Sequence, residues 1–354
     1  MAIPVFFSST LRWLLLPFST LYHWITTFRN HLYDIQYKKT IDFTPFIISV
    51  GNLSVGGTGK TPMVAYLAEW LSHNYSLAIL SRGYGRQTRG VRIASEEDTA
   101  RTLGDEPYLF YRKFKQGERA TVAVGEERIA AVPEILFRAP DTQLILLDDA
   151  YQHRAIARDF NILLTSYQRP FYEDQVLPSG RLRESRAGAQ RADAVIITKC
   201  PDPMSEEDKQ RMTGKVLGYA SPDVPVYFTG IRYGTPQPAF ELREMTDPVV
   251  LFSGLADASL FEAYARKNFT VVDHITFADH HRYNDKDRHQ LAAARLKAGP
   301  SASLLTTEKD MVKLEDPAWQ SLPVFYLPIQ PYFLSSEDSF QDRLLQRIKT
   351  YHRD

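Results

Sequence analysis

The spacing of apolar residues predicts a helix with two unlike faces near the N-terminus. Apolar side chains recur at alternating intervals of three and four residues, which places them on one side of a helix. These residues are Phe7, Leu11, Leu14, Phe18, Leu21, Ile25 and Phe28. The other side is polar and carries Ser9, Arg12, Ser19, His23, Thr26 and Asn30. Residues 1–40 are therefore expected to form an amphipathic segment, with Pro17 as the place for a kink.

The apolar side of this helix suits the surface of a membrane better than its interior. A spanning helix needs about twenty continuous apolar residues, whereas Arg12, Ser19 and His23 interrupt this run. Trp13 and Trp24 add the character of a membrane interface. A secretory signal is disfavoured, because the start lacks a Lys/Arg-rich region and no small-x-small cleavage site follows. The alternative is a helix that packs against its own domain.

Beyond residue 40 the pattern alternates between short apolar runs and helical spacing, which is typical of parallel α/β sheets. The first series has strands over 46–50, 77–80, 144–149, 160–164 and 194–199 and helices over 63–73 and 108–114. The second has strands over 249–252, 270–275, 303–305 and 324–327 and helices over 258–267, 285–297 and 336–351. Between them, prolines become frequent and apolar runs shorten. We therefore expect a domain at 41–220, a linker at 221–247 that could be two-stranded, and a smaller α/β domain at 248–354.

Composition narrows the function classes. A chain of 354 residues favours two domains over one core. Lys+Arg and Asp+Glu both number 42, so the zero net charge argues against nucleic-acid binding driven by a positive field. The single cysteine, Cys200, cannot form an internal disulfide and fits a reducing cytosol. No obligate protein partner is inferred.

The segment from Phe46 to Pro62 has the pattern of a phosphate-binding loop. A strand runs into a glycine-rich turn and then a helix, so backbone N–H groups and the helix N-terminus can surround phosphate oxygens. Lys60 can reach the β- and γ-phosphates, and the Thr61 hydroxyl can hold Mg²⁺. The expected loop residues are Ser54, Val55, Gly56, Gly57, Thr58, Gly59, Lys60 and Thr61. Ser54 replaces the first glycine of the usual pattern, and an ordinary strand-to-helix turn would explain the glycines but not the Lys-Thr pair.

Other polar residues that could take part in chemistry come just after predicted strands or at the start of predicted helices. Asp148 and Asp149 end a buried strand, as expected for carboxylates near Mg²⁺. The segment 81–86 places arginines among glycines at a strand end and suits an anion, although a solvated turn has the same composition. Asp105 could cap a helix or take a substrate proton. Asp279 and His280 lie in a polar segment that could hold zinc, form a proton relay or simply face solvent.

Taken together, the motifs resemble tetraacyldisaccharide 4′-kinases, the lipid A pathway kinases of Gram-negative bacteria. The resemblance runs in order over almost the whole chain. The motifs are Gly51–Pro62, Ser81–Arg86, Gly104–Pro107, Leu147–His153, Pro178–Glu184, Phe277–His281 and Thr306–Asp310. The loops of that family resemble this one, so Ser54 is not a departure from the family's pattern.

The resemblance implies a reaction and roles for the residues. It implies transfer of the ATP γ-phosphate to the 4′-hydroxyl of a tetraacyldisaccharide 1-phosphate, a lipid at the cytoplasmic face of the inner membrane. The implied base is Asp105, tuned by His280 with Asp279 beside it, while Lys60 contacts phosphate. The implied Mg²⁺ groups are Thr61, Asp148, Asp149 and Glu184. The implied contacts to the substrate are Arg82, Tyr84, Arg86 and Arg183.

Two alternatives belong to other classes. P-loop ATPases and GTPases of the metallochaperone and partitioning type use a similar loop, but they often carry a lysine where Val55 stands. GTP is less suited than ATP, because the segment Thr198–Pro201 lacks the aspartate that reads guanine. A membrane-bound scaffold that binds nucleotide without chemistry would not need Asp105, Asp148 or Asp149.

Overall fold

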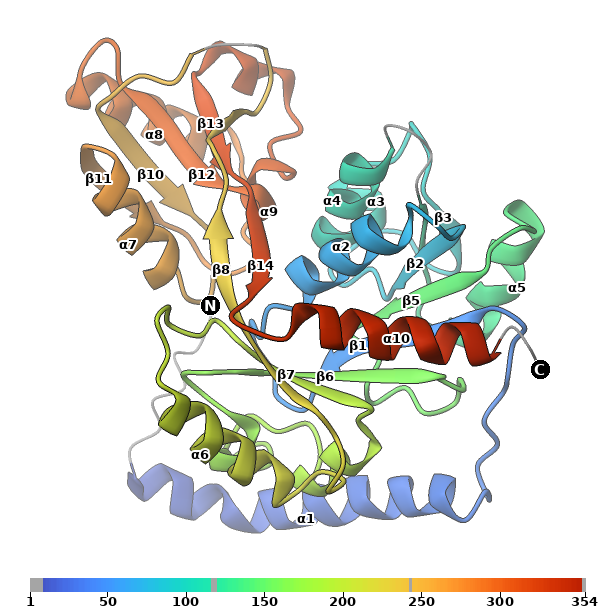
Figure 1. Cartoon of the computed structure of the whole chain (residues 1–354). Coiled ribbons are helices and arrows are strands. Elements are labelled where there is room, and N and C mark those ends of the chain that lie inside the picture. Colours follow the sequence, from blue (N-terminus) through green and yellow to red (C-terminus); the bar gives the residue numbers. More distant parts are fainter. Residues whose placement is uncertain (1–8, 116–119, 242–243, 352–354) are drawn as a thin grey trace.

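A computed structural model describes residues 9–115, 120–241 and 244–351, with side chains at the N-terminus from residue 14 onward. Phe7 and the side chains of Ser9, Leu11, Arg12 and Trp13 lie outside the described part. Two sheets form the molecule (Figure 1), and the larger has nine strands in the order β14-β8-β7-β6-β1-β5-β2-β4-β3. These strands are β1 (Phe46–Asn52), β2 (Leu77–Ser81), β3 (Arg92–Ile93), β4 (Thr121–Val124), β5 (Leu144–Asp148), β6 (Phe160–Ser166), β7 (Ala194–Thr198), β8 (Val226–Tyr233) and β14 (Ile329–Phe333).

The central strands of the large sheet are parallel and covered on both faces. β1 lies between β5 and β6, and Val50 pairs with Asp148 on one side and Ile162 on the other. One face packs against α2 (Lys60–Leu71), α4 (Asp105–Phe114) and α10 (Glu337–Tyr351). The other packs against α5 (Arg128–Arg138) and α6 (Glu206–Leu217). Burial on both faces explains the near-continuous apolar runs of these strands.

The second sheet has five strands in the order β11-β10-β12-β13-β9. These strands are β9 (Gln237–Pro238), β10 (Val249–Ser253), β11 (Val271–Thr276), β12 (Ser303–Thr307) and β13 (Val324–Leu327). α7 (Ser259–Asn268) and α8 (Asp285–Ala298) bury Phe261 and Leu291 against it. The remaining short helices are α3 (Ala100–Leu103), α9 (Glu308–Met311), η1 (Phe171–Glu173), η2 (Arg186–Arg191) and η3 (Pro317–Ser321). The expected fold, a parallel sheet with a smaller α/β unit and an N-terminal helix, is confirmed.

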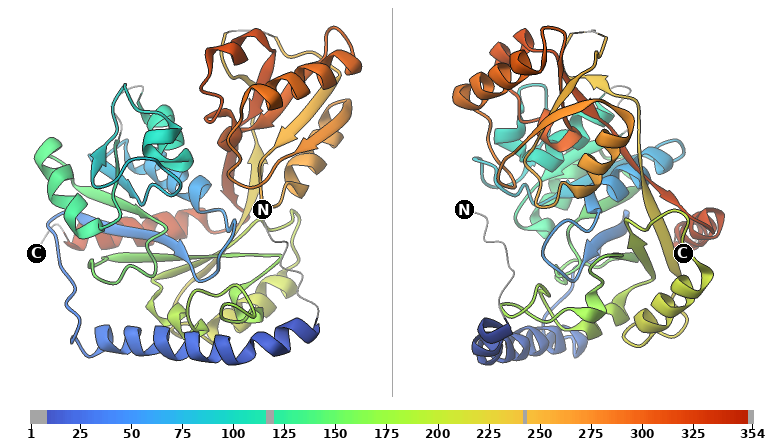
Figure 2. Two further views of the ribbon diagram at one scale, coloured as in Figure 1. Left: turned by 180° about the vertical axis from the view of Figure 1, so that it is seen from behind. Right: turned by 90° about the vertical axis from the view of Figure 1, so that its left-hand side faces the viewer.

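The C-terminal part of the chain returns to the large sheet, which differs from the expected division at residue 248. β14 pairs antiparallel with β8, and Phe333, Phe340, Leu344 and Ile348 enter the core beneath α2 and β1. The expected linker contains β8, and β8 pairs with β14 from the C-terminal part of the chain. Among the described residues, the small sheet is built by β9 to β13, and it stands above the large sheet in both views of Figure 2.

The N-terminal helix α1 (Ser9–Asp34) turns its polar side inward. Ser19 hydrogen-bonds Ser179, with 2.8 Å between the hydroxyl oxygens, and Tyr22 donates to the Arg183 carbonyl. Asn30 donates to Glu184 at 2.6 Å. The apolar residues Leu14, Phe18, Leu21, Ile25 and Phe28 are 58–68% exposed. Figures 1 and 2 show α1 lying along the end of the molecule opposite the small sheet.

Candidate active site

The phosphate-binding loop follows β1 and ends at α2, as its sequence predicts. Gly56 and Gly59 adopt positive φ angles of 115° and 80°, which side chains other than glycine rarely adopt. Thr58 is held from two sides, because Asn52 donates to its hydroxyl and Thr198 donates to its carbonyl, both at 2.8 Å. Lys60 is the first residue of α2, and Thr61 follows it in the same turn. The loop is therefore held in place at Thr58 and leads into a helix N-terminus, which suits phosphate oxygens.

Asp148 and Asp149 lie beside this loop at the end of β5. Lys60 Nζ lies 3.7 Å from Asp149, and Arg183 donates to the same carboxylate oxygen at 2.9 Å. Burial opposes ionisation of Asp149, but these two cations outweigh it and hold its pKa below the usual value. Asp149 also has a left-handed backbone, with φ of 49°. Strained backbone of this kind, which costs about 1–3 kcal/mol, is commonly found at functional sites.

Asp148 is buried and keeps one carboxylate oxygen without a partner. Ser81 donates to its Oδ2 at 3.1 Å, whereas no described group bonds to Oδ1. Burial raises the pKa of this carboxyl, and the charges of Glu106 and Asp149 raise it further. An unpaired carboxylate oxygen beside a second carboxylate is a donor set that suits a hard cation such as Mg²⁺.

Glu184, for which the resemblance implied a place near Mg²⁺, is engaged by protein groups in the structure. Its carboxylate is fully buried and accepts hydrogen bonds from Asn30, Gln152 and Arg191 at 2.6, 3.0 and 2.7 Å. In the described ranges no three acidic, histidine or cysteine side chains gather as a metal-binding group. Glu184 forms an ion pair with Arg191 of η2, and its hydrogen bond from Asn30 ties α1 to the rest of the chain.

The long loop between η1 and η2, which carries Glu184, is hydrogen-bonded to the phosphate-binding loop. Val55 donates to the Arg181 carbonyl at 2.8 Å, and Arg183 donates through its backbone to Leu53 at 2.7 Å. Ser54 forms a bridge with Leu182. These contacts bring Arg183 close to Asp149, although the two residues are 34 positions apart in the sequence.

Asp105 and His280 are brought together from the two sheets. His280 Nδ1 lies 3.1 Å from Asp105 Oδ2, across a sequence separation of 175 residues. Gly104 occupies the N-cap position of α4, so Asp105 is the first helical residue and does not cap the helix. His280 has a left-handed φ of 58°, and Asp279 Oδ2 lies 4.0 Å from its Nε2. The Asp105–His280 pair therefore links the small sheet to the large one. Glu106, the residue after Asp105, lies near enough to Asp148 for its charge to raise the pKa of that carboxyl.

The arginine-rich loop after β2 supplies both exposed and buried side chains. Tyr84 is 74% exposed, and its ring centre lies 5.6 Å from that of His280. Arg82 is also exposed. Arg86 is buried instead, with 2% of its side chain exposed, and pairs with Glu126 at 2.6 Å. Its guanidinium holds the loop in the structure, and its contact to substrate stays a prediction.

Sequence reasoning missed two groups at this edge. Lys309, on α9, lies 3.6 Å from both Glu106 and Asp279. Arg128 donates to the Asp148 carbonyl from α5 at 3.3 Å. The segment Thr306–Asp310 was singled out only as part of a motif, and no local signal marked Lys309.

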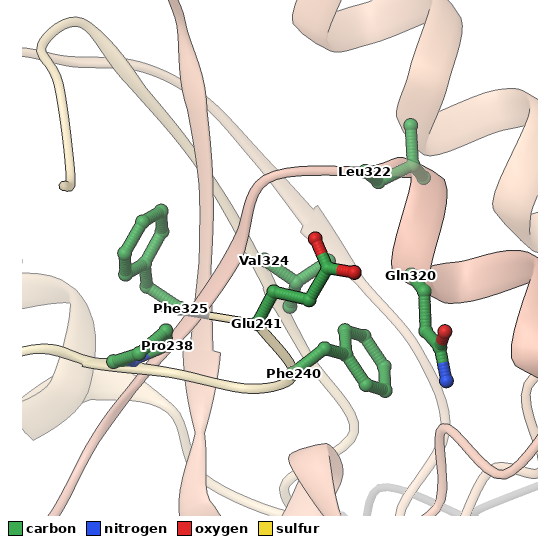
Figure 3. A pocket seen from close by; sticks show the side chains of 7 residues that line it. All are labelled: Pro238, Phe240, Glu241, Gln320, Leu322, Val324 and Phe325. Carbon is green, nitrogen blue, oxygen red and sulfur yellow. The ribbon is translucent and has the colours of Figure 1, made fainter. Parts of the chain in front are cut away.

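Two hollows of the surface lie away from the phosphate-binding loop. Figure 3 shows one of about 10 Å³ between Phe240, Leu322 and Val324, which has room for about one water molecule. The other, of about 330 Å³, lies between α1 and the long loop and is lined in part by His23, Leu182 and Tyr219. Neither hollow marks the candidate active site, which is identified instead by the polar side chains around the phosphate-binding loop.

Comparisons with known proteins agree with this geometry. A family profile described as tetraacyldisaccharide-1-P 4′-kinase matches residues 11–349. The tetraacyldisaccharide 4′-kinase of Flavobacterium johnsoniae is 40% identical over 344 residues, covering 96% of this chain and 98% of the relative. That of Cytophaga hutchinsonii is 39% identical over 347 residues, covering 96% and 95%.

A solved structure of LpxK from Aquifex aeolicus in complex with ATP also resembles this chain. It superposes with a TM-score of 0.76 at 32% identity and covers 96% of this chain and 99% of its own. Sequence and fold thus agree over nearly the full length. The chain belongs to the tetraacyldisaccharide-1-P 4′-kinase family.

Proposed function

We propose that this chain transfers the γ-phosphate of ATP to the 4′-hydroxyl of a tetraacyldisaccharide 1-phosphate, a step of lipid A biosynthesis. The observation that carries the proposal is the Asp105–His280 pair at 3.1 Å, which lies at the edge of the sheet that also holds Lys60 and Asp149. Relatives at 38–40% identity bear the name of this activity, and a structural relative was solved with ATP.

The phosphates of ATP would lie in the loop from Ser54 to Thr61. Backbone N–H groups and Lys60 would neutralise the charge that spreads over the γ-phosphate oxygens in the transition state. Thr61, Asp148 and Asp149 would hold Mg²⁺, which when bound neutralises phosphate charge and fixes the geometry of the triphosphate. Arg183, paired with Asp149, would contact the same phosphates.

Asp105 would act as the base for the acceptor. As the lipid oxygen forms its bond to phosphorus, the bond to the β-phosphate oxygen breaks and ADP leaves, while the hydroxyl proton passes to Asp105. The bond from His280 orients the carboxylate for this step. Asp279 lies on the other side of the ring, and exposed Arg82 and Tyr84 would contact the substrate.

We further propose that α1 lies on the cytoplasmic face of the inner membrane. The apolar side of the helix faces outward, and its polar side is occupied by bonds to the chain. No helix among the described residues has the length and apolar content to cross a bilayer. A lipid with four acyl chains leaves a bilayer at great cost, since each buried CH₂ contributes about 0.8 kcal/mol. A kinase that binds the membrane surface avoids this cost.

The test is phosphate transfer in mixed micelles that contain the disaccharide 1-phosphate, Mg²⁺ and labelled ATP. We expect a bisphosphorylated lipid from the wild type and a loss of about 100-fold or more for Asp105→Asn, with ATP binding retained. Asp285→Asn is the matched control, because Asp285 is also the first residue of a helix and is exposed. ATP hydrolysis without labelled lipid would support a P-loop ATPase instead, and full transfer by Asp105→Asn would exclude this residue as the base.

A further inference from the structure

Lys309 faces the ring of His280 at the nitrogen that does not contact Asp105. Its Nζ lies 3.4 Å from His280 Nε2, and it is 3.6 Å from the carboxylates of Glu106 and Asp279. Burial disfavours the charge on Lys309, but the neighbouring carboxylates outweigh burial and raise its pKa. Lys309 is therefore an ammonium ion at neutral pH.

The two partners of the imidazole require one tautomer. An ammonium group has only donors, so the Nε2 that it faces must be the bare acceptor. An ionised carboxylate only accepts, so the Nδ1 that faces Asp105 must carry the hydrogen. A doubly protonated ring would point an N–H at the ammonium and add a second positive charge beside it.

Asp279 competes with this arrangement. Its Oδ2 lies 4.0 Å from His280 Nε2 and would attract a hydrogen there. Lys309 is near both groups, 3.4 Å from Nε2 and 3.6 Å from the other oxygen of the same carboxylate, and balances its charge. Without the ammonium, Asp279 favours hydrogen on Nε2.

The backbone that carries Lys309 is fixed. Thr307 caps α9 by accepting from the Asp310 backbone at 3.1 Å. Asp310 is fully buried and accepts from the Gly254 backbone at 3.0 Å. The segment is thus tied to the loop after β10, and the position of the ammonium is set by the small sheet.

We propose that Lys309 is a positioning residue that holds His280 as the neutral Nδ1–H tautomer, so that the ring donates to Asp105 without placing a positive charge next to it. The inference rests on the proposed function, in which Asp105 is the base. A charged imidazolium would stabilise the carboxylate further and weaken it as a base. Lys309 thereby keeps Asp105 both oriented and basic.

The test measures the tautomer and the rate separately. Nitrogen NMR of the ¹⁵N-histidine-labelled protein at pH 8 reports which ring nitrogen carries hydrogen, and the His280→Gln spectrum identifies the His280 signals. We expect Nδ1–H in the wild type and a shift toward Nε2–H in Lys309→Met. In that variant kcat should fall by about 10- to 100-fold while the KM for ATP stays within about twofold.

Three further variants complete the experiment. Lys309→Arg, which keeps a cation with donors only, should restore the tautomer and much of the rate. Adding Asp279→Asn to Lys309→Met should remove the competing carboxylate and bring hydrogen back to Nδ1. Lys286→Met, which removes an exposed lysine from α8, should resemble the wild type.

The outcomes separate the two proposals. An unchanged tautomer in Lys309→Met overturns the inference, even if the rate falls, because the residue would then act only on stability. A wild type that transfers no phosphate to lipid overturns the proposed function, whatever the NMR spectrum shows.

Discussion

Replacing Phe18, Leu21 and Ile25 with serine tests whether the outward face of α1 binds a membrane. These side chains are 63, 61 and 58% exposed. Full burial of such a side chain contributes about 1.5–3 kcal/mol, so the exposed part of each contributes about 1–2 kcal/mol when it enters lipid. The triple variant therefore loses about 3–6 kcal/mol of partitioning free energy, which is about 100- to 20,000-fold in the partition coefficient.

The assay is sedimentation with phospholipid vesicles, with ATP binding and thermal unfolding measured on the same samples. ATP affinity and unfolding should change little, because the inward contacts of Ser19, Tyr22 and Asn30 remain. Phe137→Ser is the matched control, since this residue is 79% exposed on α5. Partitioning of the triple variant within threefold of the wild type would refute a membrane role for this face.

Three other predictions concern Glu184, Arg86 and His153, whose surroundings in the fold are not apparent from the neighbouring sequence. Glu184→Gln should lower stability by about 3–5 kcal/mol, measured by urea unfolding, because the half-buried Arg191 loses its counterion. Arg86→Ala should lower the unfolding midpoint and leave the KM for lipid unchanged, whereas Tyr84→Ala should raise that KM; the reverse pattern would support Arg86 as a substrate contact. Burial and nearby arginines lower the pKa of His153 to about 4, so the unfolded chain gains a proton below about 6.5 that the folded chain does not. Stability should fall as the pH drops from about 6.5 to about 4, by up to about 2 kcal/mol after allowance for solvent screening, and His153→Gln should reduce that fall.

Periodicity predicted the buried central strands but not the edges of the sheet. β1, β5, β6 and β7 are apolar runs covered on both faces, and their sequences carry that signal. β14 contains Pro331 and was not predicted, because proline argues against a central strand. The structure places β14 at the edge, paired only with β8, where proline is tolerated. The helices α5 and α6 were also missed, and Pro133 lies inside α5.

At the site, local motifs predicted the groups that lie close to each other in sequence. The phosphate-binding loop and the Asp148–Asp149 strand end lie together as their spacing indicates. The pairing of Asp105 with His280 came only from the family resemblance, because no local pattern encodes a contact across 175 residues. The place of Glu184 near a metal also came only from the resemblance, and the arginine-rich sequence around it gives no sign of its burial.

The return of β14 and α10 to the large sheet affects the order in which the protein can fold during synthesis. The phosphate-binding loop is complete early in translation, but Phe340, Leu344 and Ile348 emerge near the end and fill the core beside α2. Until then the apolar face of β1 and α2 lacks part of its cover, although domains often fold as they leave the ribosome. The nascent chain therefore depends on its last helix, and a ribosome that stalls after β13 releases a chain with an exposed, aggregation-prone sheet face.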